Sequence, residues 1–226
     1  MKVRVWDLPV RLFHWLLVAL VAGAFIAAKI GGNAMAWHGR IGLAILGLLV
    51  FRIVWGFTGS TYARFRQFVR GPAAVRAYLR GEWHGAGHNP LGALSVLAML
   101  CLLCAQAATG LFANDDVAFQ GYLYPLAGAD ISAKITGIHK LLEKALILLV
   151  LTHVGAIAFY ARVKGDNLVK PMLTGWKEMP EGEDVRGGGA VAFAIAAVIA
   201  AAAVWAASGA LLPAPEPPAS TSIPDW

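Results

Sequence analysis

Residues 138–160 read IHKLLEKALILLVLTHVGAIAFY, an apolar segment with one histidine near each end, His139 and His153. A helix rises about 1.5 Å per residue, so this segment is long enough to cross a hydrocarbon core of about 30 Å. The two histidines are separated by about 21 Å and about four full turns, which places both imidazoles on one face. The segment therefore predicts a membrane-spanning helix with two polar groups at two depths.

Four further stretches, at about 10–30, 38–58, 91–112 and 190–212, have the length and apolarity of membrane spans. The composition agrees, because 58% of the 226 residues are hydrophobic and only 14% are charged, against roughly 25% charged in soluble proteins. A signal peptide is the alternative for the first stretch, but its apolar run exceeds the usual signal core. We expect an all-α integral membrane protein, a four-helix bundle with a fifth C-terminal transmembrane helix, and no binding to nucleic acid.

The charge distribution predicts the orientation in the membrane. With the N-terminus inside, the inner segments hold fourteen of the nineteen Lys and Arg residues, as the positive-inside rule requires. This predicts a multi-pass protein of the bacterial inner membrane, with a cytoplasmic N-terminus and a periplasmic C-terminus. We expect a transmembrane domain over 1–180, followed over 181–226 by a linker, the fifth span and a Pro-rich periplasmic tail. The inner segments 72–83 and 167–179 suit either interfacial helices or ordinary basic loops.

Four histidines lie within the spans or at their ends: His14, His38, His139 and His153. Ionisable side chains in a bilayer are costly and are functional candidates by default. His38 matches His139 in depth at the outer face, and His14 matches His153 toward the inner face. Two histidine pairs, one above the other, are therefore predicted between helices.

Bis-histidine haem explains two such pairs, since each neutral imidazole can give one nitrogen to iron while the macrocycle lies between helices. Zinc usually takes three or four protein ligands, and a proton relay usually includes acidic partners, of which only Glu143 is near. Structural or relay histidines and another metal stay open as alternatives. No C-x-x-C-H motif for covalent haem is present, and Cys101 and Cys104 suit small apolar packing.

Haem propionates need cations or donors at the membrane edge. Arg52 and Arg11 lie at the depth of the inner pair, and Arg40 and Lys140 flank the outer pair. For each of them, a snorkelling interfacial cation is the equal alternative. His84 and His88 suit solvated or capping roles, with contact to quinone or to a haem edge as the alternative.

Three motifs together resemble a known family. VWDLPVRLFHW (5–15), HGRIG (38–42) leading to Phe51-Arg52, and GHNPLGAL (87–94), with the His139 and His153 pair, resemble the bacterial di-haem cytochrome b561 family. That family includes the b-type cytochrome subunit of nickel–iron hydrogenases, and the resemblance covers about residues 3–180. It implies two haem b groups, the inner one ligated by His14 and His153 and the outer one by His38 and His139.

The resemblance also implies a function. We expect transmembrane electron transfer between the quinone pool and a redox partner such as a periplasmic c-type cytochrome or a hydrogenase subunit. The outer segment 113–137, with Asp115, Asp116 and Asp130, is expected to cover the outer haem and to dock a basic partner. The alternatives are a stand-alone superoxide:quinone oxidoreductase and, from another class, a haem-free membrane anchor or transporter; the oligomeric state stays open.

Overall fold

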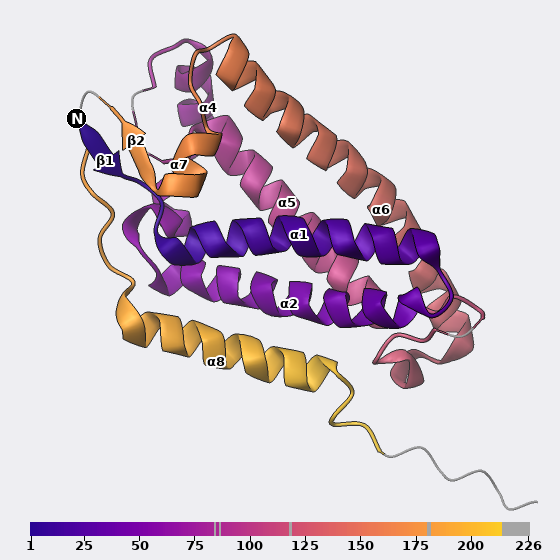
Figure 1. Cartoon of the computed structure of the whole chain (residues 1–226). Coiled ribbons are helices and arrows are strands. Elements are labelled where there is room, and N and C mark those ends of the chain that lie inside the picture. The colour runs from indigo at the N-terminus through magenta and orange to yellow at the C-terminus, as the bar shows by residue number, and fades with distance from the viewer. Residues whose placement is uncertain (84, 86, 118, 180–181, 214–226) are drawn as a thin grey trace, which may run out of the picture.

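The computed structural model describes residues 1–83, 85, 87–117, 119–179 and 182–213. Five helices in this part of the chain are long and apolar enough to cross a membrane. They are α1 (Leu8–Ile30), α2 (Ala34–Thr58), α5 (Pro90–Gly110), α6 (Tyr124–Arg162) and α8 (Gly189–Ala207) (Figure 1). The five predicted spans and the all-α integral membrane class are therefore confirmed, whereas His84 and the tail from residue 214 lie outside the described residues.

Local sequence explains where two of these helices begin. Asp7 caps α1, because its Oδ1 accepts a hydrogen bond from the Val10 backbone N–H at 2.7 Å. Asn89 caps α5 in the same way, with its Oδ1 2.7 Å from the Gly92 backbone nitrogen. A proline stands in the first turn of each helix, where a missing N–H has no consequence.

Helices α1, α2, α5 and α6 form the bundle, and their shared core is apolar. Each contributes to one buried cluster, which includes Phe13, Leu49, Leu100 and Leu146. Helix α8 packs along α2 outside this bundle (Figure 1). A Cβ on Gly47 would lie 2.8 Å from the Val204 side chain, so small residues permit this close approach.

Helix α6 begins earlier than predicted, at Tyr124 rather than near residue 138, and it is kinked at Gly128, which has φ 71°. Hydropathy marks where a chain enters the bilayer, and it therefore misses the polar first turns of a longer helix. The expected long outer loop over 113–137 is thus wrong in its second half. Its first half is fastened to α6, since the Asn114 backbone N–H donates to Thr136 Oγ1 at 3.0 Å.

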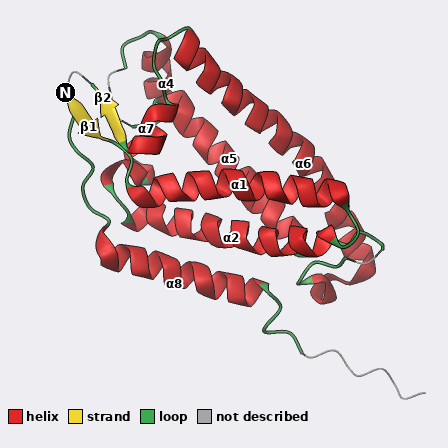
Figure 2. Cartoon of the chain, in the orientation of Figure 1, coloured by secondary structure: helices red, strands yellow, loops and turns green. Residues whose placement is uncertain are grey.

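Short elements gather at the end of the bundle where the chain starts. They are β1 (Lys2–Arg4), the 3₁₀ turn η1 (Thr61–Ala63), α3 (Phe65–Phe68), α4 (Pro72–Leu79), α7 (Val169–Thr174) and β2 (Trp176–Glu178). Strands β1 and β2 pair antiparallel, with Val3 opposite Lys177 (Figure 2). We call this end, which carries β1 and β2, the sheet end, and the opposite end the far end. Helices lie in both predicted interfacial segments, but the segment 167–179 finishes as a strand.

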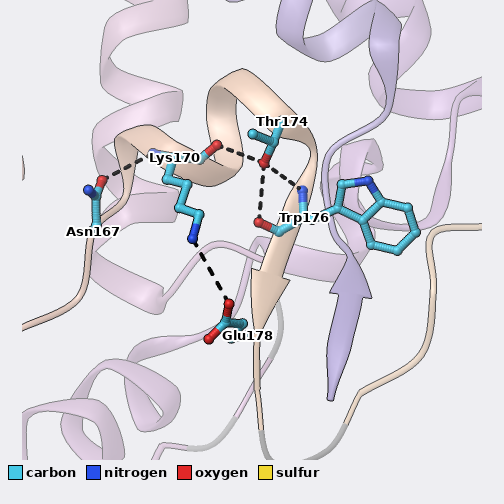
Figure 3. Close-up of polar contacts among 5 residues, drawn as sticks. All are labelled: Asn167, Lys170, Thr174, Trp176 and Glu178. Carbon is cyan, nitrogen blue, oxygen red and sulfur yellow. Dashed lines mark hydrogen bonds and ion pairs between the residues drawn. The ribbon is translucent and has the colours of Figure 1, made fainter.

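The turn between α7 and β2 is held by local hydrogen bonds (Figure 3). The Asn167 side chain accepts from the Lys170 backbone N–H at 3.1 Å, and Thr174 Oγ1 donates to the Lys170 carbonyl at 2.9 Å and accepts from the Trp176 N–H at 3.2 Å. Gly175 ends α7 with φ 88°, a conformation that favours glycine. The turn therefore reverses the chain and sets β2 beside β1.

The segment 182–187, which leads to α8, is also tied to the sheet end. The Arg4 backbone N–H donates to Asp184 Oδ1 at 2.7 Å, and the Tyr62 hydroxyl donates to the Glu183 carbonyl at 2.7 Å. Thr61 N–H donates to the Arg186 carbonyl at 2.8 Å. These bonds join β1, η1 and the segment that leads to α8.

Candidate functional site

The far end brings together one of the two predicted histidine pairs. The ring centroids of His38 on α2 and His139 on α6 are 6.2 Å apart, with ring planes at 83°. A metal–imidazole bond is about 2.0–2.1 Å long. Two imidazoles on opposite sides of one metal atom therefore have centroids roughly 6 Å apart, so the observed spacing suits a shared metal.

Both rings of this pair are oriented by a neighbouring helix. His38 Nδ1 lies 2.9 Å from the Ala24 carbonyl of α1, and since a carbonyl only accepts, Nδ1 carries the hydrogen. His139 Nδ1 lies 3.0 Å from Thr109 Oγ1 of α5, whose own hydroxyl hydrogen can be donated to the Ala105 carbonyl at 2.8 Å. Each imidazole thus presents an Nε2 lone pair, the arrangement that oriented metal ligands use.

A cavity of about 500 Å³ lies beside this pair, between α1, α2, α5 and α6. Its walls are mainly apolar, with Lys29, Lys140 and Glu143 among the lining residues. Glycines keep the space open, since a Cβ on Gly110 would lie 3.1 Å from His139 Cε1. Two imidazole donors beside a mainly apolar cavity of this size fit a b-type haem.

A glutamine occupies part of this site. Gln106 on α5 places its side-chain nitrogen 3.1 Å from His139 Nε2, and its buried Oε1 has no hydrogen-bond partner. The amide donates to the lone pair that a metal would take. Gln106 must therefore give up this hydrogen bond when a metal binds His139.

The second predicted pair lies toward the sheet end. His14 on α1 and His153 on α6 are close enough to interact electrostatically. The buried His14 Nδ1 has no hydrogen-bond partner, and buried polar atoms in folded proteins rarely lack one. The unpartnered His14 nitrogen and its proximity to His153 are compatible with a ligand that both imidazoles would hold.

The four predicted cations differ in their surroundings. Arg52 is only 3% exposed, and its buried Nη1 has no partner. Arg11 donates to the Leu173 carbonyl at 2.5 Å, while its Nε has no partner. Arg40 is exposed and lies over the Trp37 ring, and Lys140 is exposed at the rim of the far-end cavity. The sheet-end arginines thus resemble ligand-binding groups more than Arg40 does.

His88 is half-buried and lies between two aromatic rings, so it is not a freely solvated side chain as one expected role required. Its ring packs against Trp6 and Phe68, with centroid distances of 4.6 and 4.7 Å. Burial lowers the pKa of His88 to about 3, and the positive charge of Arg52 lowers it further in the same direction. The imidazole is therefore neutral near pH 7, and its buried Nδ1 has no partner.

Sequence reasoning missed the supporting residues Thr109, Gln106 and Asp7. Asp7 is buried and, besides capping α1, accepts hydrogen bonds from Trp55 Nε1 at 2.9 Å and from the Ser60 hydroxyl. The available signal was chemical: Gln106 and Thr109 are two of the few polar residues in a mainly apolar span. Polar groups at such positions need a partner in the bundle.

Known proteins resemble most of the chain. The model of a family described as prokaryotic cytochrome b561 matches residues 5–175. Two relatives named probable Ni/Fe-hydrogenase 1 B-type cytochrome subunit, from Escherichia coli strain K12 and from Escherichia coli O157:H7, are each 26% identical over 137 residues. The match covers 47% of this chain and 57% of each relative, so the chain spans little more than half of their length.

No solved structure matches the chain. The family match nevertheless includes all four histidines of the two pairs and ends before α8 begins at Gly189. The resemblance found in the sequence motifs is thereby confirmed. The chain belongs to the prokaryotic cytochrome b561 family of membrane proteins that carry b-type haem.

Proposed function

We propose that this protein carries electrons across a membrane through two bis-histidine b haems. His38 and His139 would hold the far-end haem, and His14 and His153 the sheet-end haem. The observation that supports this most directly is the 6.2 Å spacing of the His38 and His139 ring centroids, with each Nδ1 held by a neighbouring helix. The His139 Nε2 becomes free for a metal once Gln106 gives up its hydrogen bond. When bound, each haem supplies reversible one-electron chemistry at its iron.

The protein's own contribution is ligation, spacing and exclusion of water. His139 and His153 stand on one helix and set the two ligand levels about 21 Å apart. The apolar cluster that contains Phe13, Leu49 and Leu146 fills the bundle with groups that admit little water. Axial ligands, hydrogen bonds to them and burial are the features by which a protein adjusts a haem potential.

The charges favour one orientation. Arg and Lys residues concentrate at the sheet end, which we place in the cytoplasm, and the far end and the C-terminus in the periplasm of a bacterial inner membrane. We further propose a family domain over 1–180, close to the matched range 5–175, and a fifth-helix region over 181–226. The oligomeric state stays open in this proposal.

Quinone is the proposed partner at one end and a redox protein at the other. A hydrogenase subunit is one candidate, supported by the names of the relatives; a c-type cytochrome is the other. Asp116 is exposed and Asp130 is exposed near the kink of α6, so the far end offers carboxylates to a partner with a basic surface. Replacing both Asp116 and Asp130 by Asn should weaken the binding of such a partner and should make the binding less dependent on salt. Unchanged binding would refute docking at these carboxylates.

The test of the haem assignment is a visible spectrum of the purified protein with and without dithionite. We expect a sharp b-type α band and about two haems per chain. His139→Ala should lose the far-end haem only, and His153→Ala the sheet-end haem only, so each variant is the control for the other. Loss of the same haem in both variants would contradict the pairing, and a colourless protein would favour an anchor or transporter.

A second assay separates the two haem functions. Purified protein that reduces quinone with superoxide unaided would favour the stand-alone oxidoreductase over the electron carrier with a fixed partner. Co-purification of a c-type cytochrome or a hydrogenase subunit would favour the carrier. Both experiments use the whole chain in detergent or vesicles.

A further inference from the structure

The segment 59–83, which follows α2 at the sheet end, carries a surplus of positive charge. It contains five arginines and one glutamate, Glu82. Arg64 is half-buried, and its Nε donates to the Gly59 carbonyl at 2.7 Å. The other four arginines are exposed: Arg66, Arg70, Arg76 and Arg80. In the described part of the chain none of the five forms an ion pair, so the segment presents four exposed charges that no carboxylate there neutralises.

Helix α4 lies in this segment and has little protein around it. Its eight residues contact α5 at the sheet end, but none of them is buried (Figure 1). Leu79 is 68% exposed, and Val69, just before the helix, is 43% exposed. A helix this short is marginal in water, and packing of an apolar face is what usually stabilises a helix in a protein. A surface outside the described chain that covers these apolar side chains would therefore stabilise α4.

The position of α4 in the fold brings it to the membrane surface. Helix α2 ends at Thr58 and α5 begins at Pro90, so the connection between these two spans begins and ends on the same side of the membrane. Asn89 donates to the Tyr160 hydroxyl in the last turn of α6 at 3.2 Å, which fastens the end of the connection to a third span. Because α4 contacts the start of the bundle through α5, it lies at the height of the lipid headgroups.

The spacing of the arginines suits a bound anion. Arg76 and Arg80 are one helical turn apart, and like charges at this spacing on one helix face repel each other. An anion between them removes this repulsion. Guanidinium groups bind phosphate oxygens through two parallel hydrogen bonds, which an ammonium group does not do. Exposed arginines beside an exposed Leu79 and Val69 are thus the combination that a helix on an anionic membrane surface uses.

We infer that the segment 64–83 binds anionic phospholipids at the membrane surface. Arg76 and Arg80 bind the headgroup phosphates, and Leu79 enters the boundary with the acyl chains. An acidic protein surface is the competing occupant; it would match the arginines, whereas the exposed Val69 and Leu79 suit acyl chains better. The inference does not depend on the proposed haems, because it uses only exposed side chains of one segment outside the spans.

The experiment measures hydrogen–deuterium exchange of the full-length protein in two kinds of nanodisc. One contains phosphatidylcholine alone, and the other contains phosphatidylcholine and phosphatidylglycerol in equal parts. The backbone amides of α4 report on the site, and those of α5 are the internal reference for folding. A titration of the detergent-solubilised protein with phosphatidylglycerol gives the affinity, and a titration with inorganic phosphate tests whether the anion alone is enough.

Three double variants accompany the unmodified protein. Arg76→Gln with Arg80→Gln removes both charges, and Arg76→Lys with Arg80→Lys keeps them. Lys2→Gln with Lys170→Gln is the matched control, because both lysines are exposed at the sheet end and lie outside the segment. Lys170 also has a carboxylate partner already, since its Nζ lies 3.9 Å from Glu178 Oε1 (Figure 3).

We expect phosphatidylglycerol to slow the exchange of the α4 amides and to leave the α5 amides unchanged. The two Gln substitutions should lower the affinity for phosphatidylglycerol roughly 10–30-fold, as the loss of two basic residues at an anionic surface predicts. The two Lys substitutions should have a smaller effect, and the lysine control should match the unmodified protein. High salt should weaken the slowing, because it screens exposed charges.

Equal exchange of α4 in the two nanodiscs, with α5 protected in both, would overturn the inference and leave the segment to an acidic protein or to solvent. Inorganic phosphate that slows the exchange as much as phosphatidylglycerol does would overturn it as well, because Leu79 would then have no part in binding. An equal loss of affinity in the lysine control would show that net charge alone attracts the lipid. None of these results bears on the proposed function, which the visible spectrum of the haems tests.

Discussion

The hydroxyl of Thr109 is expected to control how tightly the far-end haem is held. Thr109 Oγ1 lies 3.0 Å from His139 Nδ1 and orients the proposed ligand from the neighbouring helix. Thr109→Val keeps the side-chain shape and removes the acceptor. The variant should therefore bind haem at the sheet end normally and at the far end weakly.

Two estimates of the magnitude agree. Leaving a buried N–H without an acceptor costs about 1–3 kcal/mol. Loss of a hydrogen-bonded partner behind a metal ligand typically lowers metal affinity about 10–100-fold, which is about 1.4–2.8 kcal/mol at about 1.4 kcal/mol per tenfold change. We therefore expect the far-end haem to be lost roughly 10–100 times more readily.

The assay is transfer of haem to an excess of a haem-scavenging protein, followed by the visible spectrum and the haem-to-protein ratio. Thr109→Ser should restore retention, because it restores the hydroxyl. Thr58→Val is the control, since the Thr58 hydroxyl donates to the Val54 carbonyl of its own helix at 3.0 Å and lies on the surface. If Thr109→Val retains the far-end haem as well as the unmodified protein, or loses the sheet-end haem instead, the ligand-orienting role of Thr109 is refuted.

Three further predictions concern the rest of the bundle. Asp7→Ala removes a helix cap and the acceptor of two buried donors, so it should lower the free energy of unfolding by about 3–7 kcal/mol and weaken the sheet-end haem first, as measured by thermal unfolding in detergent and haem content; equal stability would contradict the buried network. Gly47→Leu places a side chain where Val204 packs and should detach α8, so that protease cuts the segment 182–187 faster while the spectrum is unchanged; equal cutting would contradict this packing. The pKa of His88 is about 3 in the folded protein and about 6.5 when unfolded, so the unfolded chain binds the proton first and the unfolding temperature should fall as pH decreases from about 6.5 toward 3; His88→Phe should flatten this slope, and an unchanged slope would contradict the assignment.

Much of the fold follows from local pattern and length. All five spans could be predicted because a run of about 20 mainly apolar residues is typical of a membrane-spanning helix. Depth along two helices that cross the membrane in the same direction predicted that His38 would meet His139, and the structure places their rings in contact. These features depend on spacing within a helix, which the sequence contains directly.

Other features depend on partners far away in the chain. Strands of three residues, such as β1 and β2, carry too little alternation to be recognised, and they pair only because the turn after α7 reverses the chain. The burial of His88 results from contact with Trp6 and Phe68, which no local pattern indicates. The kink at Gly128 likewise separates the helix start from the membrane entry.

The same limit applies to the site. A threonine in a helix usually returns its hydroxyl to a carbonyl of its own helix, so Thr109 looks like an ordinary helical residue until α6 is placed beside α5. Arg52 and Arg11 were equally attractive as snorkelling cations, and their burial and unpaired nitrogens are tertiary facts. The residue types could be named from the sequence, but their partners needed the packed bundle.

The pairing of β1 with β2 fixes an order of events during synthesis. Lys2–Arg4 emerges first, whereas Trp176–Glu178 becomes available only after α6 has been made; at about 5–20 residues per second this delay is roughly 9–35 s. Until then β1 lacks its partner strand, and the Val5 and Trp6 backbone N–H groups lack the Gly175 carbonyl to which they donate. The sheet end of the growing polypeptide is thus completed only after α6, which carries two of the proposed ligands, has left the ribosome.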